Sequence, residues 1–237
     1  MPVDVLLFGA HPDDVEWGAG GTALLLKRRA AAFAIVDLTG GEMGSRGTAV
    51  ERRIEAERAA DYLGAAGREC LNMSDGALAD SPEARKQVAA AIRQHRPRLV
   101  LAPYWEDRHP DHSAAGLMIR NSALCCTSRK SEDPNPPHKP DAVLYYLLHH
   151  FTRPSIVVDI SSVYENKLEL IRVHESQFAK SAAGFGVIPH GLGDYIFGLE
   201  SRDRFFGSLI GVHHGEALVS EVPLSIGNLS YIAELLR

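Results

Sequence analysis

Residues 8–22, F-G-A-H-P-D-D-V-E-W-G-A-G-G-T, place one imidazole and two carboxylates within four positions. These side chains, His11, Asp13 and Asp14, come directly after the apolar run 3–8. Burying such charges without partners is unfavourable. A divalent metal is an economical partner, because neutral histidine and carboxylate are both good zinc ligands. The segment therefore predicts a metal site at the end of a strand, with a charged surface turn as the alternative.

The glycines that follow this turn do not predict a phosphate-binding loop. Gly18, Gly20 and Gly21 are too closely spaced for G-x-G-x-x-G, and the acidic pair precedes them.

A second cluster of the same kind occurs in residues 104–116, Y-W-E-D-R-H-P-D-H-S-A-A-G. It follows another apolar run, 99–102, and a helical pattern comes after it. Strand, polar turn and helix in this order fit a right-handed parallel sheet, whose strands place their carboxyl ends on one edge. If the two strands are neighbours, His11, Asp14 and His112 form a three-ligand set with an open fourth position, which is typical of catalytic zinc.

Three more side chains then lie beside the metal. A carboxylate next to the ligands, such as Asp13, is placed to take a proton from an activated water. His109 precedes His112 by three residues, so one helical turn would put both on the same side. His109 could stabilise an oxyanion or protonate a leaving group, with Asp111 keeping it charged.

The elements that position these residues alternate along the chain. Strands are predicted at the apolar runs 3–8, 33–38, 70–73, 99–102, 143–148 and 156–160. Helices are predicted over 22–29, 48–63, 81–96, 111–124, 162–174 and 195–208, with capping boxes at Thr48–Glu51 and Ser162–Glu165. Residues 39–48 form a glycine-rich loop, 179–193 a loose one, and 212–237 a short strand, an irregular stretch and a closing helix.

Composition is that of a soluble α/β protein, and its 237 residues fit one domain, 1–237. The net charge of −5 argues against a general nucleic-acid binder. No run approaches the roughly 18 apolar residues of a membrane span, and no signal peptide is visible, so a cytoplasmic protein without a membrane partner is expected. The cysteines, which are odd in number, are predicted to be reduced thiols: Cys70, Cys125 and Cys126.

The motifs A-H-P-D-D-V-E-W-G-A-G-G-T and R-H-P-D-H resemble those of the zinc-dependent N-deacetylases of the PIG-L/LmbE-like superfamily. Within it, the chain most resembles the bacillithiol-biosynthesis deacetylases that act on N-acetylglucosaminyl malate. The loop T-G-G-E-M-G-S-R-G-T and H-E-S-Q-F at 174–178 add to the resemblance, which covers nearly the whole chain. It implies a Rossmann-like three-layer α/β/α sandwich with a mostly parallel sheet, and a homo-oligomer, most commonly a hexamer.

The resemblance also implies roles for individual residues. Zinc would be held by His11, Asp14 and His112, and the same set accepts ferrous iron. The other implied roles are Asp13 as general base, His109 as charged partner of the tetrahedral intermediate oriented by Asp111, Arg52 on the sugar, and Tyr195 as a mobile residue closing over the pocket.

Substrate contacts are less defined. Arg108 is a candidate for the malate carboxylates from its charge and position, together with Arg46 and Arg52. From spacing alone, Arg52 and Arg53 could equally be a solvated pair. Trp17 and Trp105 flank the two motifs as pocket walls or core residues, and five further histidines are interpreted as structural or surface residues: His95, His149, His150, His213 and His214.

Two classes of function stay open. The first is a deacetylase, for the malate conjugate or for another N-acetylglucosamine conjugate such as the mycothiol precursor or a chitin oligosaccharide. The second is a noncatalytic module that binds metal or sugar. Binding alone needs neither a base nor an oxyanion partner, so the presence of Asp13 and His109 favours the enzyme.

Overall fold

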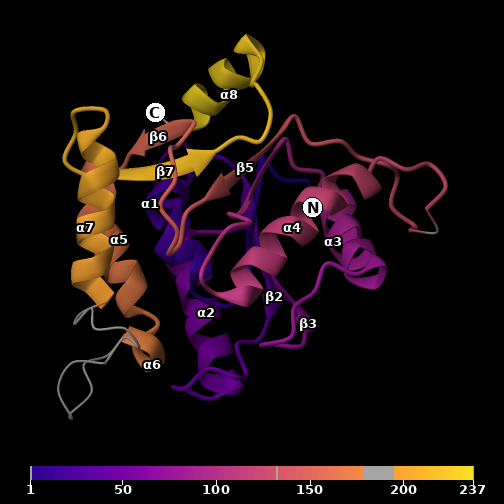
Figure 1. The fold of residues 1–237 in the computed structure, drawn as a ribbon, viewed down its shortest axis with the longest axis horizontal. Coiled ribbons are helices and arrows are strands. Elements are labelled where there is room, and N and C mark those ends of the chain that lie inside the picture. Colours follow the sequence, from indigo (N-terminus) through magenta and orange to yellow (C-terminus); the bar gives the residue numbers. More distant parts are fainter. Residues whose placement is uncertain (1, 132, 179–194, 237) are drawn as a thin grey trace.

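The computed structural model describes residues 2–131, 133–178 and 195–236, so the expectation for 179–193 lies outside it. The described strands form one seven-stranded sheet in the order β3-β2-β1-β4-β5-β7-β6 (Figure 1). The first five strands in this order run parallel, whereas β7 is antiparallel to both β5 and β6. The strands are β1 (Val5–Gly9), β2 (Phe33–Thr39), β3 (Arg68–Met73), β4 (Leu99–Pro103), β5 (Ala142–Tyr146), β6 (Ile156–Asp159) and β7 (Gly215–Val219).

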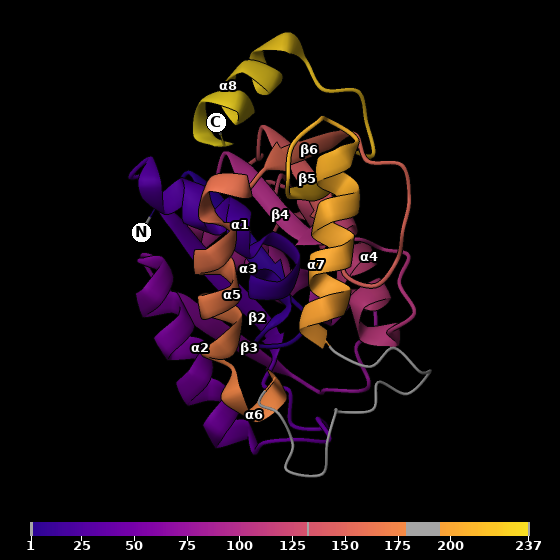
Figure 2. The same cartoon turned by 90° about the vertical axis from the view of Figure 1, so that its left-hand side faces the viewer.

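Helices cover both faces of this sheet, which confirms the predicted three-layer α/β/α sandwich. Figure 2 shows α2 and α5 on one side of the strands and α4 on the other. The helices are α1 (Asp14–Arg28), α2 (Ala49–Leu63), α3 (Pro82–His95), α4 (Pro110–Cys125), α5 (Tyr164–Arg172), α6 (Glu175–Phe178), α7 (Tyr195–Ser208) and α8 (Ile226–Leu236). None of these described helices is long and apolar enough to cross a membrane.

Alternate residues of the central strands supply two hydrophobic cores. In β1, Val5 and Leu7 face the core beneath α1, α2 and α5, whereas Leu6 and Phe8 face the core beneath α3 and α4. All five residues of β1 are buried, as expected for a central strand covered on both faces. This double burial explains why the strands appear in the sequence as continuous apolar runs.

Local signals place most of the helix ends. Thr48 and Glu51 form the predicted capping box of α2, and Gly64 ends that helix in the left-handed conformation, with φ of 67°. The second predicted capping box is wrong. The Ser162 hydroxyl accepts a hydrogen bond from Arg28 at 2.9 Å, and α5 begins at Tyr164 after the 3₁₀ turn Ser161–Val163.

Helix α1 starts at Asp14, eight residues before its predicted start, and it is kinked at Ala19, which has φ of −140° and ψ of 17°. Its glycine-rich first half packs very closely on the sheet. A Cβ at Gly18 would overlap the ring of Tyr146, which is fixed because its hydroxyl donates to the carbonyl of Phe8 at 2.6 Å.

We expect Gly18→Ala to lower the free energy of unfolding by about 1–3 kcal/mol, because the added methyl overpacks a buried contact. Gly198→Ala in α7 is the matched control, since a Cβ added there would meet none of the other described residues within 4 Å. That substitution should be neutral or stabilising by up to about 1 kcal/mol through helix propensity. Urea denaturation of both variants measures the difference, and a Gly18→Ala protein as stable as the wild type would contradict the packing described.

Candidate active site

The two acidic turns meet because β1 and β4 are parallel neighbours, with Val5 paired to Leu99. His11 lies in the turn after β1, Asp14 opens α1, and His112 lies in the first turn of α4. The His112 Nε2 is 3.2 Å from Asp14 Oδ1, and the His11 Nδ1 is 3.4 Å from Asp14 Oδ2. The structure therefore brings the three predicted metal ligands together.

These three side chains fit a divalent metal. All are buried, and their donor atoms lie within 4.8 Å of one another. Burial alone would lower the pKa of His11 and His112, but nearby carboxylates, chiefly Asp14, raise these pKa values to about 11 and about 9. Burial would raise the pKa of Asp14, but the two imidazoles hold it well below its usual range. Two imidazoles around one ionised carboxylate are a donor set that zinc and ferrous iron both accept.

Two further carboxylates contact the other ring nitrogens of the two histidines in the predicted metal site. Asp107 Oδ1 lies 3.1 Å from His112 Nδ1, and Asp75 Oδ1 lies 3.1 Å from His11 Nε2. Carboxylates in this position fix the tautomer and ring orientation of metal-binding histidines. Neither residue is among the predicted site residues. Asp107 lies in the second acidic turn, and Asp75 follows β3 at the same sheet edge, so position alone could have marked both.

Asp111 and His109 touch through the backbone rather than through the carboxylate. The Asp111 N–H donates to His109 Nδ1 at 3.2 Å, while its carboxylate accepts from the N–H groups of Gly76 and Leu78 at 2.7 and 3.2 Å. Burial and the neighbouring imidazoles of His112 and His11 lower the pKa of His109. This direction runs against the expectation that Asp111 keeps His109 charged.

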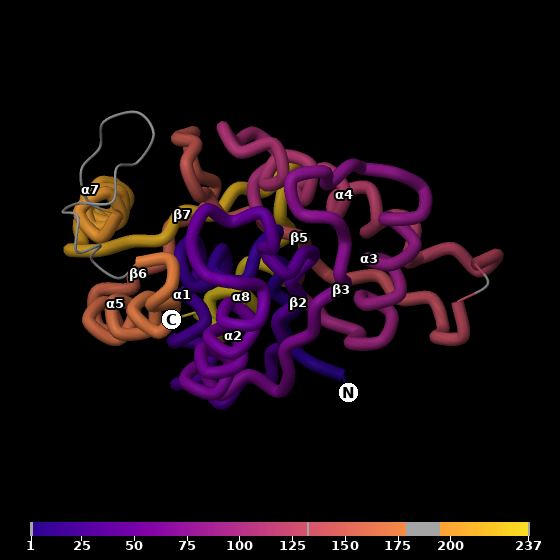
Figure 3. The backbone as a smooth tube through the Cα atoms, turned by 90° about the horizontal axis from the view of Figure 1, so that it is seen from below, coloured from indigo at the N-terminus to yellow at the C-terminus, as the bar shows by residue number. Residues whose placement is uncertain are grey.

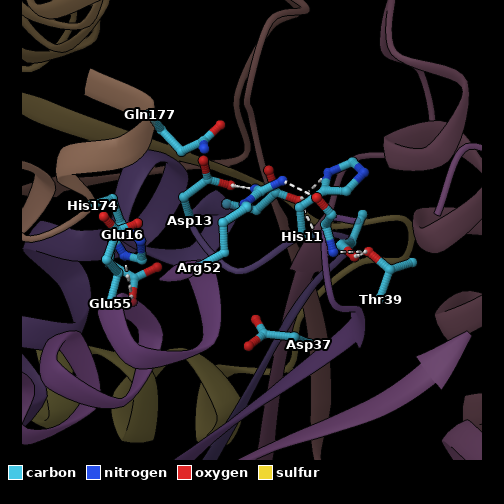
Figure 4. Close-up of polar contacts among 12 residues, drawn as sticks. His11, Asp13, Glu16, Asp37, Thr39, Arg52, Glu55, His174 and Gln177 are labelled. Carbon is cyan, nitrogen blue, oxygen red and sulfur yellow. Dashed lines mark hydrogen bonds and ion pairs between the residues drawn. The ribbon is translucent and has the colours of Figure 1, made fainter. Parts of the chain in front are cut away.

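The predicted base and the predicted sugar-binding arginine form an ion pair. Arg52 Nη2 lies 3.2 Å from Asp13 Oδ1, and Arg52 Nη1 donates to the carbonyl of Gly41 at 2.8 Å (Figure 4). Gly41 has φ of 67°, and a Cβ there would overlap this guanidinium, so the glycine-rich loop makes room for Arg52. Arg53 is exposed beside Glu57, so only the first of the two arginines faces the site.

The other predicted substrate contacts lie around this centre. Arg108 is exposed in the second acidic turn. Tyr195 begins α7. Its ring lies edge-on to those of Trp17 and Phe178, with ring centres 6.2 and 5.8 Å apart. Trp17 is buried in the core and stacks on Phe178. Contact of Arg108 or Tyr195 with substrate stays a prediction.

His149, interpreted from the sequence as a structural or surface residue, lies close to the predicted metal ligands. Its ring stacks on that of His112, with 5.4 Å between the ring centres, and its backbone N–H donates to Asp107 Oδ2 at 2.8 Å. Burial, with help from the charges of His112 and Arg108, lowers its pKa to about 4, so the ring is neutral at physiological pH. The sequence does not predict this position of His149, because the residue lies far from the two acidic turns along the chain. It approaches them only because β5 pairs with β4.

Comparison with known proteins identifies the family. The family model PIG-L, GlcNAc-PI de-N-acetylase, matches residues 6–123. A diacetylchitobiose deacetylase from Thermococcus kodakarensis is 36% identical over 189 residues, which cover 73% of this chain and 70% of that protein. The chain belongs to the PIG-L family.

Two further relatives extend the comparison. A probable N-acetyl-alpha-D-glucosaminyl L-malate deacetylase 2 from Bacillus cereus is 27% identical over 75% of this chain and 84% of its own length. The solved structure of the conserved protein TT1542 from Thermus thermophilus is 36% identical, with a TM-score of 0.84 over 94% of this chain and 96% of that chain. The mostly parallel α/β fold is therefore shared with that solved structure.

We expect Asp107→Asn to weaken zinc binding by about 10–100-fold, the usual effect of losing a carboxylate that orients a ligand histidine. Glu106→Gln is the matched control. Glu106 precedes Asp107 in the chain, but its carboxylate is largely exposed and lies 3.7 Å from His150. Competition with a chromogenic chelator measures both affinities. Equal affinity in Asp107→Asn and Glu106→Gln would show that Asp107 does not orient His112.

Proposed function

We propose that this protein is a metal-dependent hydrolase that removes the acetyl group from an N-acetylglucosamine conjugate. The observation that carries the proposal is the buried set His11, Asp14 and His112 with a fourth side chain, Asp13, beside it, in a chain of the PIG-L family. Zinc is the proposed metal, and ferrous iron is the alternative. A bound divalent ion supplies Lewis acidity and lowers the pKa of water toward 7.

Asp13 is the proposed general base. Its Oδ1 is held by Arg52, which leaves Oδ2 to take the proton of the attacking water. Arg52 is buried and donates to Gly41 as well, so it fixes the direction of this carboxylate. We therefore propose that Arg52 positions the base, in place of the direct sugar contact implied by the resemblance.

His109 is the proposed oxyanion partner. The centre of its ring lies 4.9 Å from that of His11 and 4.6 Å from that of His112, so it lies on the rim of the metal set. Because Nδ1 accepts the Asp111 N–H, the hydrogen of the neutral ring lies on Nε2. That Nε2–H can donate to the oxygen of the amide as negative charge develops there.

A chitobiose-type disaccharide is the proposed substrate, ahead of the malate conjugate. Support comes from the higher identity to the diacetylchitobiose deacetylase, 36% against 27%. Malate would need cations at the mouth, yet Arg52 is paired with Asp13, and Arg46 donates to the carbonyl of Gln177 at 3.4 Å. The exposed Arg108 and the Bacillus relative keep malate as the second candidate.

The test of this function is release of free amine by zinc-loaded protein from diacetylchitobiose, N-acetylglucosaminyl malate and free N-acetylglucosamine. We expect kcat/KM to be highest for diacetylchitobiose, and activity to disappear on chelation and return with zinc. A higher kcat/KM for the malate conjugate would reverse the order of the two substrates. No amine from any of the three would leave a noncatalytic binding module as the better interpretation.

Asp13→Asn should keep the metal and lose turnover by about 10²–10⁴-fold, the usual contribution of a general base. Asp14→Asn is the matched control on the adjacent carboxylate and should lose the metal together with activity. Metal content and kcat are measured on the same preparations. Metal loss in Asp13→Asn with retention in Asp14→Asn would mean that the two roles are exchanged.

A further inference from the structure

The break in α1 separates the active-site end of this helix from the rest. Ala19 is not helical, so residues 14–18 form a short first segment that carries Asp14, with Asp13 as its N-cap residue. A break leaves N–H groups after it and carbonyls before it without their helical partners. These groups are buried here, because residues 14–26 of α1 are all buried, so other atoms must satisfy them.

Two charged side chains hydrogen-bond to three of these backbone groups. Glu216 of β7 accepts the backbone N–H groups of Gly21 and Thr22 at 2.8 and 2.7 Å, and the Thr22 hydroxyl at 2.6 Å. Arg202 of α7 donates to the carbonyl of Trp17 at 2.6 Å. An anion thus caps the start of the second segment and a cation caps the end of the first, as the helix dipole favours.

Two more charges join these caps into one chain of ion pairs. Lys167 Nζ lies 2.7 Å from Glu216 and 2.6 Å from Asp203, and Asp203 Oδ1 accepts from Arg202 at 2.9 and 3.0 Å. All four side chains are at least 95% buried, and their formal charges cancel. The elements that carry them, α5, α7 and β7, lie with α1 at one end of the molecule (Figure 3).

The glycines that follow Ala19 allow these elements to approach. A Cβ at Gly21 would lie 2.6 Å from Ile160 Cγ2, and one at Gly20 would lie 3.2 Å from Leu170 Cδ2. The run G-A-G-G-T, which forms no phosphate loop, therefore serves close packing of the broken helix.

We propose that Arg202, Asp203, Lys167 and Glu216 form a positioning network that sets the angle of α1 at Ala19 and so holds Asp13 and Asp14 in place. Apolar residues often replace buried ion pairs without loss of stability, but they could not satisfy the backbone groups at this break. The four residues are positioning residues, because their hydrogen bonds and ion pairs join them to the helix break and, through Arg202, to the carbonyls of Leu147 and Leu148, rather than to the predicted ligands. This inference rests on the proposed metal centre.

The test compares Glu216→Gln and Arg202→Gln with Arg93→Gln. Arg93 of α3 is an equally buried arginine that donates to the carbonyls of Cys126, Ser128 and Asn135, away from α1. Its loss should destabilise the fold without moving the first segment of α1. The measurements are zinc affinity of the metal-free protein by chelator competition, kcat and KM, and hydrogen exchange of the Gly21 and Thr22 amides.

We expect the two network variants to bind zinc at least about tenfold more weakly than the wild type. Their kcat should fall with little change in KM, because small misplacements of reacting groups strongly reduce the rate. The Gly21 and Thr22 amides should exchange faster in Glu216→Gln, and Arg202→Lys should recover part of the zinc affinity. Arg93→Gln should keep the zinc affinity of the wild type.

Wild-type zinc affinity and kcat in both network variants would overturn the inference, and so would an equal loss in Arg93→Gln. If either variant does not fold, Thr22→Val removes a single hydroxyl bond to Glu216 and is measured in its place. A wild-type protein that binds no zinc would refute the proposed function. Unchanged exchange of the Gly21 and Thr22 amides in Glu216→Gln would show that Glu216 does not cap the second segment of α1, whatever the zinc affinity of that variant.

Discussion

The carboxylate of Asp14 is buried between two imidazoles, and the turns that carry them must stay in place to balance its charge. His11 and His112 approach it at 3.4 and 3.2 Å from turns that follow two neighbouring strands. A buried charge without partners would be strongly destabilising, so these turns must be held together in the folded state. The same requirement creates a three-donor site at the edge of the sheet where a divalent ion can bind.

Successive layers of polar contacts hold this arrangement. Asp107 and Asp75 contact the ring nitrogens of His112 and His11 that face away from Asp14. Each carboxylate also accepts a backbone N–H, Asp107 from His149 and Asp75 from Met43. Deeper in the protein, Glu16 of α1 pairs with Arg68 of β3 at 2.5 Å. The first segment of α1 is therefore tied to the sheet by charge as well as by packing.

The sequence predicts the parts of this site that depend on local order. The motifs H-P-D-D and H-P-D-H, each in the turn after an apolar run, place His11, Asp14 and His112 at the carboxyl ends of two strands. That these strands are neighbours is a condition of the prediction, which the pairing of β1 with β4 meets. Contacts between distant segments are not visible in this way. Arg28, which is 134 residues away in sequence, donates a hydrogen bond to the Ser162 hydroxyl. The capping box that spacing alone predicts at Ser162 is therefore not formed. The start of α1 is hidden because glycine weakens a helix by about 1 kcal/mol per residue relative to alanine, and buried partners from other elements compensate.

The central claim is that one metal binds His11, Asp14 and His112, with Asp13 beside it. Two other, overlapping donor sets exist among the described residues, His11–His109–Asp111 and Asp107–His112–His149. Anomalous diffraction at the zinc edge from crystals of the zinc-loaded protein distinguishes the three. We predict one strong peak, bonded at about 2.0–2.2 Å to His11, Asp14 and His112. A peak on either of the other sets, or direct bonding to Asp13, would contradict this claim.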